Sequence, residues 1–352
     1  MTEEQAEDDH ENSPDEPSSE PGGLQAVGAG RDDSSLLTHV TRRAMATEFV
    51  VILPERWSHA VEIAFQTMEQ LDQIENALTI YREDSEISAL NREASDRPVR
   101  LSQPTFELLQ RAILWSERTE GAFDVTAGPL VEAWGFTRRS GRKPTEHEVE
   151  SALQKVGYQH LVLNEADQTV RFDKPAMAIN LGAIGKGDAL DRIAEGLQDQ
   201  GVTDFLIHGG NSSVLAAGDQ HIGSGQGWPV GVAHPTKPKR RLAGLWLRDQ
   251  SLATSGSGKQ FFHHRGKRYG HVIDPRTGYP AGDLMSLTVL TKSAADADAC
   301  ATGLFVTGRE HIARVSQAND WSPDMVLVRQ GERQDQVDIE THGDVAWVEE
   351  LS

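Results

Sequence analysis

The chain has 352 residues and 38% hydrophobic content, which is enough to bury a substantial core as one large domain or two modest ones. Its formal net charge of -20 excludes the class of general nucleic-acid-binding proteins, because such proteins need a basic face for the phosphate backbone. No apolar stretch approaches the length of a membrane span, and a single cysteine, Cys300, excludes an internal disulfide.

The N-terminal segment, residues 1–36, differs in composition from the rest of the chain. It is rich in Glu, Asp, Ser, Pro and Gly and poor in aliphatic side chains, so it cannot bury enough surface to offset the entropy of ordering. We predict a disordered acidic tail here and a folded domain over residues 37–352. The N-terminus shows neither a secretory signal nor a cysteine for lipid attachment, which predicts a cytoplasmic protein.

The first half of the folded region alternates strands with amphipathic helices. Residues 48–53 form a buried apolar run that predicts a strand, and apolar residues recur at helical spacing over residues 57–78. Ser85 has the composition of a helix cap for a short helix or turn over residues 85–90. Further helices are predicted at residues 104–120, 145–155 and 188–198, and a hairpin at residues 161–163 and 169–172.

The second half is richer in strands. Short apolar runs predict strands at residues 205–207, 214–216, 229–232, 242–247, 252–254, 286–290 and 325–328, with one helix over residues 294–307. Several consecutive strands in a mixed order favour an α+β fold with a largely antiparallel sheet.

One stretch, residues 121–136, shows neither helical nor alternating spacing. Loops of this composition bend around a ligand or pack as a turn. The residues alone favour a packed turn in which Phe123 and Trp134 are anchored in the core.

A glycine-spaced turn, residues 180–187, follows an apolar run and leads into a predicted helix. Its glycines allow the backbone to approach a ligand closely and to offer N–H groups at a helix start, beside Lys186. The turn is therefore a candidate phosphate site, although a glycine-rich turn is also a common way for the chain to change direction.

Two further polar clusters lie near the C-terminus. Asp298 and Thr302 are four residues apart, so a helix places their oxygens on one face, as Mg²⁺ would require. The alternative is that the acidic residues only favour the positive end of the helix, and spacing alone favours that alternative. His271 precedes a turn and is a candidate general base, although a structural histidine is the default. Lys259 does not belong to a P-loop, because Gln260 replaces the required Ser or Thr.

Several short motifs occur in a fixed order over nearly all of the folded region. They are residues 45–47, Tyr81, residues 85–91, 121–126, 129–130, 134–136, 180–187, 208–211, 255–256, 271–278 and 298–302. In this order and number they resemble the FAD:protein FMN transferase family, the ApbE proteins. The resemblance implies a single compact α+β unit of two intimately joined subdomains, with FAD between them.

The resemblance also implies an activity: Mg²⁺-dependent transfer of the FMN moiety of FAD to a threonine or serine hydroxyl of an acceptor flavoprotein, such as a membrane redox subunit, with release of AMP. The FAD site would be lined by Met45, Tyr81, Ala122, Phe123, Asp124, Asn180, Lys186 and Ile273. The metal would be held by the carbonyl of Ala183 with Asp298 and Thr302, and His271 would be the base that takes the proton of the acceptor hydroxyl.

The sequence departs from the family pattern at three positions. Asn180 stands where an Asp is usual, Asp188 where an aromatic residue is usual, and Ala46 where a glycine is usual. Two alternatives to FMN transfer stay open at this point. One is an Mg²⁺-dependent FAD pyrophosphatase that gives FMN and AMP, and the other is an FAD-binding protein without turnover.

Overall fold

The computed structural model describes residues 36–138, 141–258, 261–318, 322–333 and 336–348. The predicted acidic tail up to residue 35, together with Lys259, lies outside these ranges. Every pairing between the described strands is antiparallel, and helices pack on the sheets, which confirms the predicted α+β class. No helix in the described part of the chain has the length and apolar character needed to cross a membrane.

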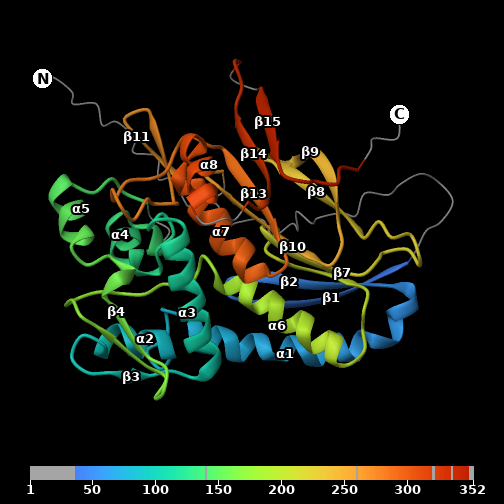
Figure 1. Ribbon diagram of the computed structural model, residues 1–352, viewed down its shortest axis with the longest axis horizontal. Coiled ribbons are helices and arrows are strands. Elements are labelled where there is room, and N and C mark those ends of the chain that lie inside the picture. The colour runs from blue at the N-terminus through green and yellow to red at the C-terminus, as the bar shows by residue number, and fades with distance from the viewer. Residues whose placement is uncertain (1–35, 139–140, 259–260, 319–321, 334–335, 349–352) are drawn as a thin grey trace, which may run out of the picture.

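The centre of the molecule is an eight-stranded sheet (Figure 1). Its strands in spatial order are β1 (Leu37–Ala44), β2 (Thr47–Pro54), β6 (Phe205–Gly209), β7 (Ser213–Ala217), β10 (Gln250–Gly256), β13 (Ser286–Thr291), β14 (Asp324–Gln330) and β15 (Val337–His342). Six of these strands contain the apolar runs that predicted them, whereas β1 and β15 are amphipathic edge strands and were not predicted. Polar and apolar residues are mixed along both strands, so a search for apolar runs does not find them.

Helices cover one face of this sheet and a hairpin covers the other. Figure 1 shows α1 (Val61–Leu78) and α6 (Gly185–Asp199) running side by side beneath the sheet, while α7 (Ala294–Thr307) packs against β10 and β13. α8 (Arg309–Ala318) continues after α7. On the opposite face, Trp228 and Val230 of the hairpin β8 (Trp228–His234) and β9 (Lys237–Leu247) join a second apolar cluster with Val50 and Leu206.

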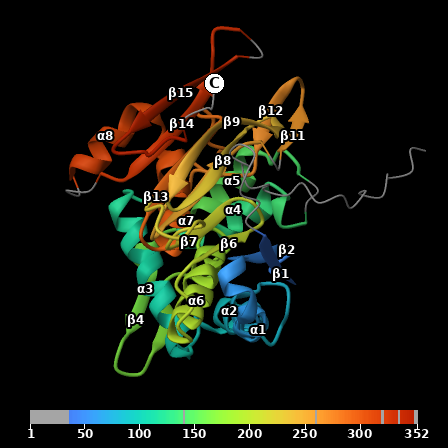
Figure 2. The same ribbon diagram turned by 90° about the vertical axis from the view of Figure 1, so that its right-hand side faces the viewer.

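A smaller unit lies beside the sheet and appears in cyan and green in Figure 1. Its elements are α2 (Glu86–Glu93), β3 (Val99–Arg100), α3 (Gln103–Arg118), η2 (Val125–Ala127), α4 (Gly128–Ala133), η3 (Phe136–Arg138), α5 (Glu146–Leu153), η4 (Tyr158–His160), β4 (Leu161–Asn164) and β5 (Thr169–Phe172). One continuous buried core contains both Leu71 of α1 and Leu109 of α3, so the two units share their hydrophobic interior. The hairpin β11 (Phe261–His264) and β12 (Lys267–Gly270) stands at the upper edge in Figures 1 and 2.

Two expectations about the elements need correction, and some elements were not predicted. Residues 121–136 are not irregular throughout, because Pro129 near the first position of α4 opens a short helix there. Phe123 and Trp134 are nevertheless buried, as predicted for a packed turn. The helix predicted from residue 57 starts as a 3-10 turn, η1 (Glu55–Ala60), and becomes an α-helix only at Val61. The β11–β12 hairpin and α8, which were not predicted, have few apolar residues in a clear period.

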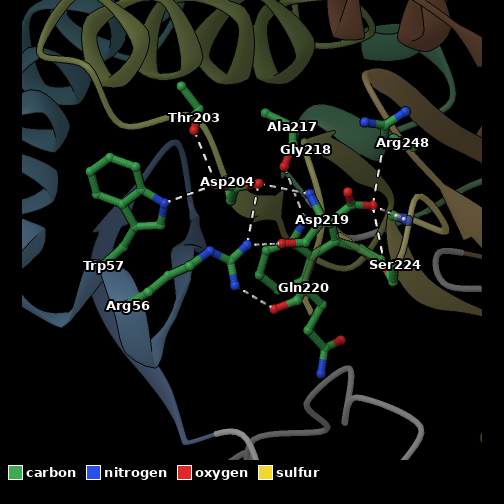
Figure 3. A network of polar contacts seen from close by, with 12 residues as sticks. Arg56, Trp57, Thr203, Asp204, Ala217, Gly218, Asp219, Gln220, Ser224 and Arg248 are labelled. Carbon is green, nitrogen blue, oxygen red and sulfur yellow. Dashed lines mark hydrogen bonds and ion pairs between the residues drawn. The ribbon is translucent and has the colours of Figure 1, made fainter. Parts of the chain in front are cut away.

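A polar network fixes the end of β6 and β7 that lies away from their connecting turn. Figure 3 shows the Arg56 guanidinium between the Asp204 carboxylate, 3.2 Å away, and the backbone carbonyls of Asp219 and Gln220. The other Asp204 oxygen accepts a hydrogen bond of 3.0 Å from the Trp57 indole. Burial alone would raise the pKa of Asp204, but the Asp219 N–H, the indole and the guanidinium together lower it. The opposite end of these strands, residues 210–212, is thereby held at the site described next.

Candidate functional site

The twelve residues that the sequence singled out all line one cavity of about 1070 Å³. They come from the β1–β2 turn, the segment after α1, the segment before α4, the turn before α6 and its first helical residues, the segment after β12 and helix α7. They are Met45, Tyr81, Ala122, Phe123, Asp124, Asn180, Ala183, Lys186, His271, Ile273, Asp298 and Thr302. The cavity therefore forms where the large sheet, its helices and the smaller unit meet, and the role of each residue stays a prediction.

Asp298 is the buried carboxylate of the cavity, with 6% of the residue exposed. Its Oδ1 accepts a hydrogen bond of 2.6 Å from the Ser213 hydroxyl, and its Oδ2 accepts one of 2.8 Å from the Gly187 N–H. The ammonium of Lys186 lies 3.8 Å from Oδ2. Burial raises the pKa of Asp298, and Lys186 and the two hydrogen bonds only partly counteract that rise. The groups around Asp298 therefore do not fully compensate the cost of burying its negative charge.

Helix α7 brings Thr302 one turn after Asp298, as the four-residue spacing predicted. The Thr302 hydroxyl donates to the backbone carbonyl of Asp298 at 2.9 Å and lies 3.1 Å from the Ser255 hydroxyl at the end of β10. The alternative, in which the acidic residues only favour the helix start, fits Asp296 instead. Its N–H is bonded to the cap residue Ser293 in the first turn of α7.

The donor set around Asp298 fits Mg²⁺. One carboxylate, one hydroxyl and a backbone carbonyl such as that of Ala183 are hard oxygen ligands, which Mg²⁺ prefers together with phosphate oxygens or water. Each Asp298 oxygen accepts one hydrogen bond and keeps a second lone pair. Within the described ranges no three His, Cys, Asp or Glu side chains gather in a position to hold a metal ion, so a cation would share hydroxyl, carbonyl and ligand oxygens.

The turn before α6 differs from the expectation of free N–H groups. Its Gly182 N–H donates to the Asn180 side chain at 2.8 Å, and the Gly187 N–H donates to Asp298. These two donors therefore serve the local fold rather than a phosphate. Gly187 is required for another reason, because a Cβ there would lie 2.1 Å from the Ala294 carbonyl oxygen where α6 crosses α7.

Asn180 is held in place by its neighbours on both sides. The Asn91 amide of α2 donates to the Ile179 carbonyl at 2.9 Å and accepts from the Ile179 N–H at 2.6 Å. The Asn180 N–H itself donates to the Val125 carbonyl at 2.8 Å. The Asn180 oxygen forms the turn to Gly182 in the way that an Asp oxygen would, so the departure from the family pattern keeps the local geometry and removes one charge.

The β1–β2 turn forms one wall of the cavity and carries backbone strain. Met45 and Ala46 have φ of 51° and 57°, and Ala44 pairs with Thr47 across this two-residue turn. Positive φ at both central positions is the geometry of a type I′ hairpin turn, which glycine and asparagine prefer. The Met45 side chain reaches Gly185, where an added Cβ would lie 3.2 Å from the Met45 Cε.

Asp124 lines the cavity, but its carboxylate is engaged by the protein itself. Oδ1 accepts from the Thr126 N–H at 2.8 Å and from the Thr126 hydroxyl at 2.7 Å, and Oδ2 accepts from the Tyr158 N–H at 2.9 Å. Burial raises the pKa of Asp124 despite these hydrogen bonds. Asp124 thus ties the segment of Ala122 and Phe123 to η4, and it shapes the cavity wall.

The exposed Tyr81 and the half-buried His271 mark the accessible side of the cavity, which we call its mouth. Tyr81 is 74% exposed, and its hydroxyl donates to the Thr137 carbonyl at 3.4 Å. Ile273 is buried in a small apolar cluster with Trp134. His271 follows β12 directly, is half-buried, and has its ring edge-on to Phe136 with centroids 6.3 Å apart. A base at this mouth would face a substrate that enters from outside.

Sequence reasoning missed two residues that hold the site together, Ser213 and Asn91. Ser213 is fully buried and orients Asp298, and Asn91 fixes the residue before Asn180. A polar residue at the start of an apolar strand is a weak signal for Ser213. Asn91 belongs to one of the recognised motifs, but nothing in the sequence indicated its partner, because that partner is 88 residues away.

Comparisons with known proteins find relatives that match most of the chain. The model of the ApbE family matches residues 45–323. The chain is 32% identical over 307 residues to the FAD:protein FMN transferase of Vibrio cholerae, which covers 86% of this chain and 90% of that protein. It is 31% identical over 264 residues to the Escherichia coli K12 protein of the same name, which covers 73% and 74%.

Two solved structures are similar to this fold. The ApbE protein of Thermotoga maritima superposes with a TM-score of 0.77 at 28% identity, over 87% of this chain and 97% of that one. The flavin transferase ApbE of Vibrio cholerae superposes with a TM-score of 0.74 at 29% identity, again over 87% and 97%.

Proposed function

This chain belongs to the ApbE family, and on that premise we propose that it transfers the FMN moiety of FAD to a threonine or serine hydroxyl of an acceptor flavoprotein and releases AMP. The observation that carries the proposal is the buried Asp298 with Thr302 and Lys186 in the wall of a cavity of about 1070 Å³. A volume at the upper end of the range for small-molecule sites suits an extended ligand such as a dinucleotide.

The proposal includes a Mg²⁺ ion held by Asp298, Thr302 and the carbonyl of Ala183. When bound, it would neutralise charge on the pyrophosphate oxygens of FAD. Ser213 and the Gly187 N–H hold the carboxylate in one orientation, and they leave a lone pair on each of its oxygens. Lys186 brings a second positive charge to the same place, which supports a site for the pyrophosphate.

His271 is the proposed proton acceptor. The acceptor hydroxyl is a weak nucleophile and therefore needs a base. Its oxygen attacks the phosphorus of the FMN half while its proton passes to a ring nitrogen of His271. The new O–P bond replaces the P–O bond to AMP, which leaves with the electron pair of that bond. His271 lines the cavity and is only half-buried, and this accessibility supports the role because the hydroxyl belongs to a second protein.

The family resemblance extends the proposal to the acceptor, which would be a membrane redox subunit that carries a short motif around the modified threonine. A comparison of two reactions tests the metal and the chemistry together. FAD is incubated with the chain and a flavoprotein acceptor, once with Mg²⁺ and once with EDTA, and AMP is followed by chromatography while covalent flavin is followed by in-gel fluorescence. We expect AMP and flavin-labelled acceptor in equal amounts with Mg²⁺ and neither with EDTA. Equal yields in both reactions would contradict the metal assignment.

A further inference from the structure

The charge of the chain is distributed unevenly, and a basic segment borders the cavity. Residues 234–268 contain nine lysines and arginines and a single acid, Asp249, in a chain whose net charge is -20. This segment forms β9, β10 and the β11–β12 hairpin. A local excess of positive charge in an acidic protein needs an explanation beyond solubility.

Two hairpins present this charge at one edge of the molecule. Lys237, Lys239 and Arg240 are exposed near the β8–β9 turn, and Arg265 and Lys267 are exposed at the tip of β11–β12. In the part of the chain that the structure describes, none of these five has a carboxylate within 4.0 Å. No carboxylate of the described chain therefore neutralises their charge, although the Lys267 ammonium lies over the Tyr269 ring, 5.5 Å from its centre. We call these five residues the basic rim.

Close contacts join the two hairpins and place them at the cavity. Gly258, before β11, approaches β8–β9 so closely that a Cβ would lie 2.1 Å from the Pro235 carbonyl oxygen. Arg268 of β12 donates to the Ser257 carbonyl at 2.6 Å and stacks 3.9 Å from the centre of the Phe261 ring. Pro235 and Gly258 both line the cavity, and His271 follows β12 directly. Figure 1 shows both hairpins in the upper half of the molecule, and in Figure 2 β9 and β12 appear next to each other.

We propose that the basic rim is the docking surface for an acidic segment of the acceptor protein, next to the hydroxyl that is modified. This inference rests on the proposed function. A hydroxyl carried by an acceptor protein can reach His271 only if the surface of that protein contacts the residues around the mouth. Complementary charge there would orient the acceptor and raise the rate of productive encounter, while each exposed pair contributes little by itself.

The test measures binding of two fluorescent 20-residue peptides to the full chain loaded with FAD. Both have a central threonine, and they differ only in their flanks, which are Asp and Glu in one and Asn and Gln in the other. We expect the acidic peptide to bind at least about ten-fold more tightly at low salt, with the preference disappearing at high ionic strength because exposed charges are screened.

Two charge reversals locate the surface. In the double variant Lys239→Glu/Lys267→Glu, we expect the preference for the acidic peptide to be lost. The matched control Lys292→Glu reverses an equally exposed lysine at the far end of β13 from the cavity residue Ser286, and should keep the preference. Equal affinities for the two peptides, or equal losses in the double variant and the control, would overturn the inference. Tighter binding of an oligonucleotide of equal charge, lost in the same double variant, would assign the surface to nucleic acid and overturn it too.

Peptide binding needs no turnover, so this outcome is separate from the proposed function. If the wild-type chain flavinylates an acceptor but shows no peptide preference, only the docking surface is wrong. Where flavinylation occurs, the double variant should raise the KM for the acceptor and leave kcat near that of the wild type, because Lys239 and Lys267 do not line the cavity.

Discussion

At the scale of single residues, Asp298 is the proposed metal ligand, and its burial costs the fold stability. Its buried carboxylate has a raised pKa, which means that the folded chain disfavours the charge that a metal would need. A buried carboxyl with a raised pKa is typical of a functional group, since a neutral residue of the same shape would stabilise the fold better. Asn provides that shape.

We expect Asp298→Asn to lower turnover by about 100-fold or more while leaving the melting temperature equal or higher, because it removes a ligand charge and also a buried charge. The Ser213 hydroxyl can rotate to accept from the new amide. The control is Asp296→Asn on the same helix, where Asp296 accepts from the Trp115 indole at 2.7 Å. That variant should keep turnover and lose some stability. Steady-state kinetics and calorimetry check both, and full activity in Asp298→Asn would remove the metal assignment.

Asn180 permits a test of charge without a change of shape. We expect Asn180→Asp to lower the Mg²⁺ concentration for half-maximal turnover several-fold, because Asp keeps the hydrogen bond from Gly182 and adds a negative charge beside Ala183. Asn164 forms the same kind of turn with the Ala166 N–H at 3.1 Å in the β4–β5 hairpin. Asn164→Asp should therefore leave the Mg²⁺ dependence unchanged. An unaltered or weaker Mg²⁺ response in Asn180→Asp would place residue 180 away from the metal.

At the scale of elements, the β1–β2 hairpin holds a cavity wall in a conformation that its turn residues resist. Left-handed backbone costs an L-residue roughly 1–2 kcal/mol, and glycine escapes most of that cost. We expect Ala46→Gly to stabilise the fold by about 1 kcal/mol. Ala166→Gly in the β4–β5 turn, where φ is not positive, should instead destabilise it slightly. Chemical denaturation measures both, and a loss of stability in Ala46→Gly would contradict the strain.

Helix α6 carries a buried carboxyl whose ionisation opposes folding. Burial raises the pKa of Asp188 to about 6, and the neighbouring acid Asp191 adds to the rise, although Arg192 lies 2.7 Å away and lowers it. A raised carboxyl pKa means that the folded state binds more protons than the unfolded state between pH 4 and 6. Stability is therefore lost as pH rises through this window, and the full loss is present at pH 7.

We expect Asp188→Asn to be more stable than the wild type by about 1–2 kcal/mol at pH 7, after allowance for the weakened contact with Arg192. The difference should shrink as pH falls through about 6 and disappear near pH 4. Denaturation midpoints of both proteins from pH 4.5 to 8 check this. A stability difference that does not change with pH would show that burial does not shift the carboxyl.

The elements that the sequence predicted well are those whose pattern is local. Helices α1, α3 and α7 have a clear apolar period or an apolar run, and their bounds agree with the prediction to within a few residues, apart from the 3-10 start before α1. The β11–β12 hairpin has no such pattern. Its side chains contact a distant segment, since the rings of Phe262 and Tyr269 lie 6.2 and 5.4 Å from that of Trp134, and local sequence does not encode those partners.

At the scale of the whole molecule, the site exists only because distant segments meet. Asp298 is oriented by Ser213 and Gly187, which are 85 and 111 residues away in the chain. Family resemblance placed the twelve lining residues around one cavity before the fold was known. It did not reveal that Asp124 and the Gly187 N–H are engaged within the protein, because that depends on contacts which only the folded chain forms.

Intact-mass spectrometry of the acceptor shows whether FMN is transferred to a protein or released free. A flavoprotein domain with the family's acceptor motif is incubated with this chain, FAD and Mg²⁺, and AMP is measured in the same sample. We expect the acceptor to gain the mass of one FMN moiety, with one AMP released for each adduct. AMP with free FMN and an unmodified acceptor, or FAD left intact, would contradict the claim.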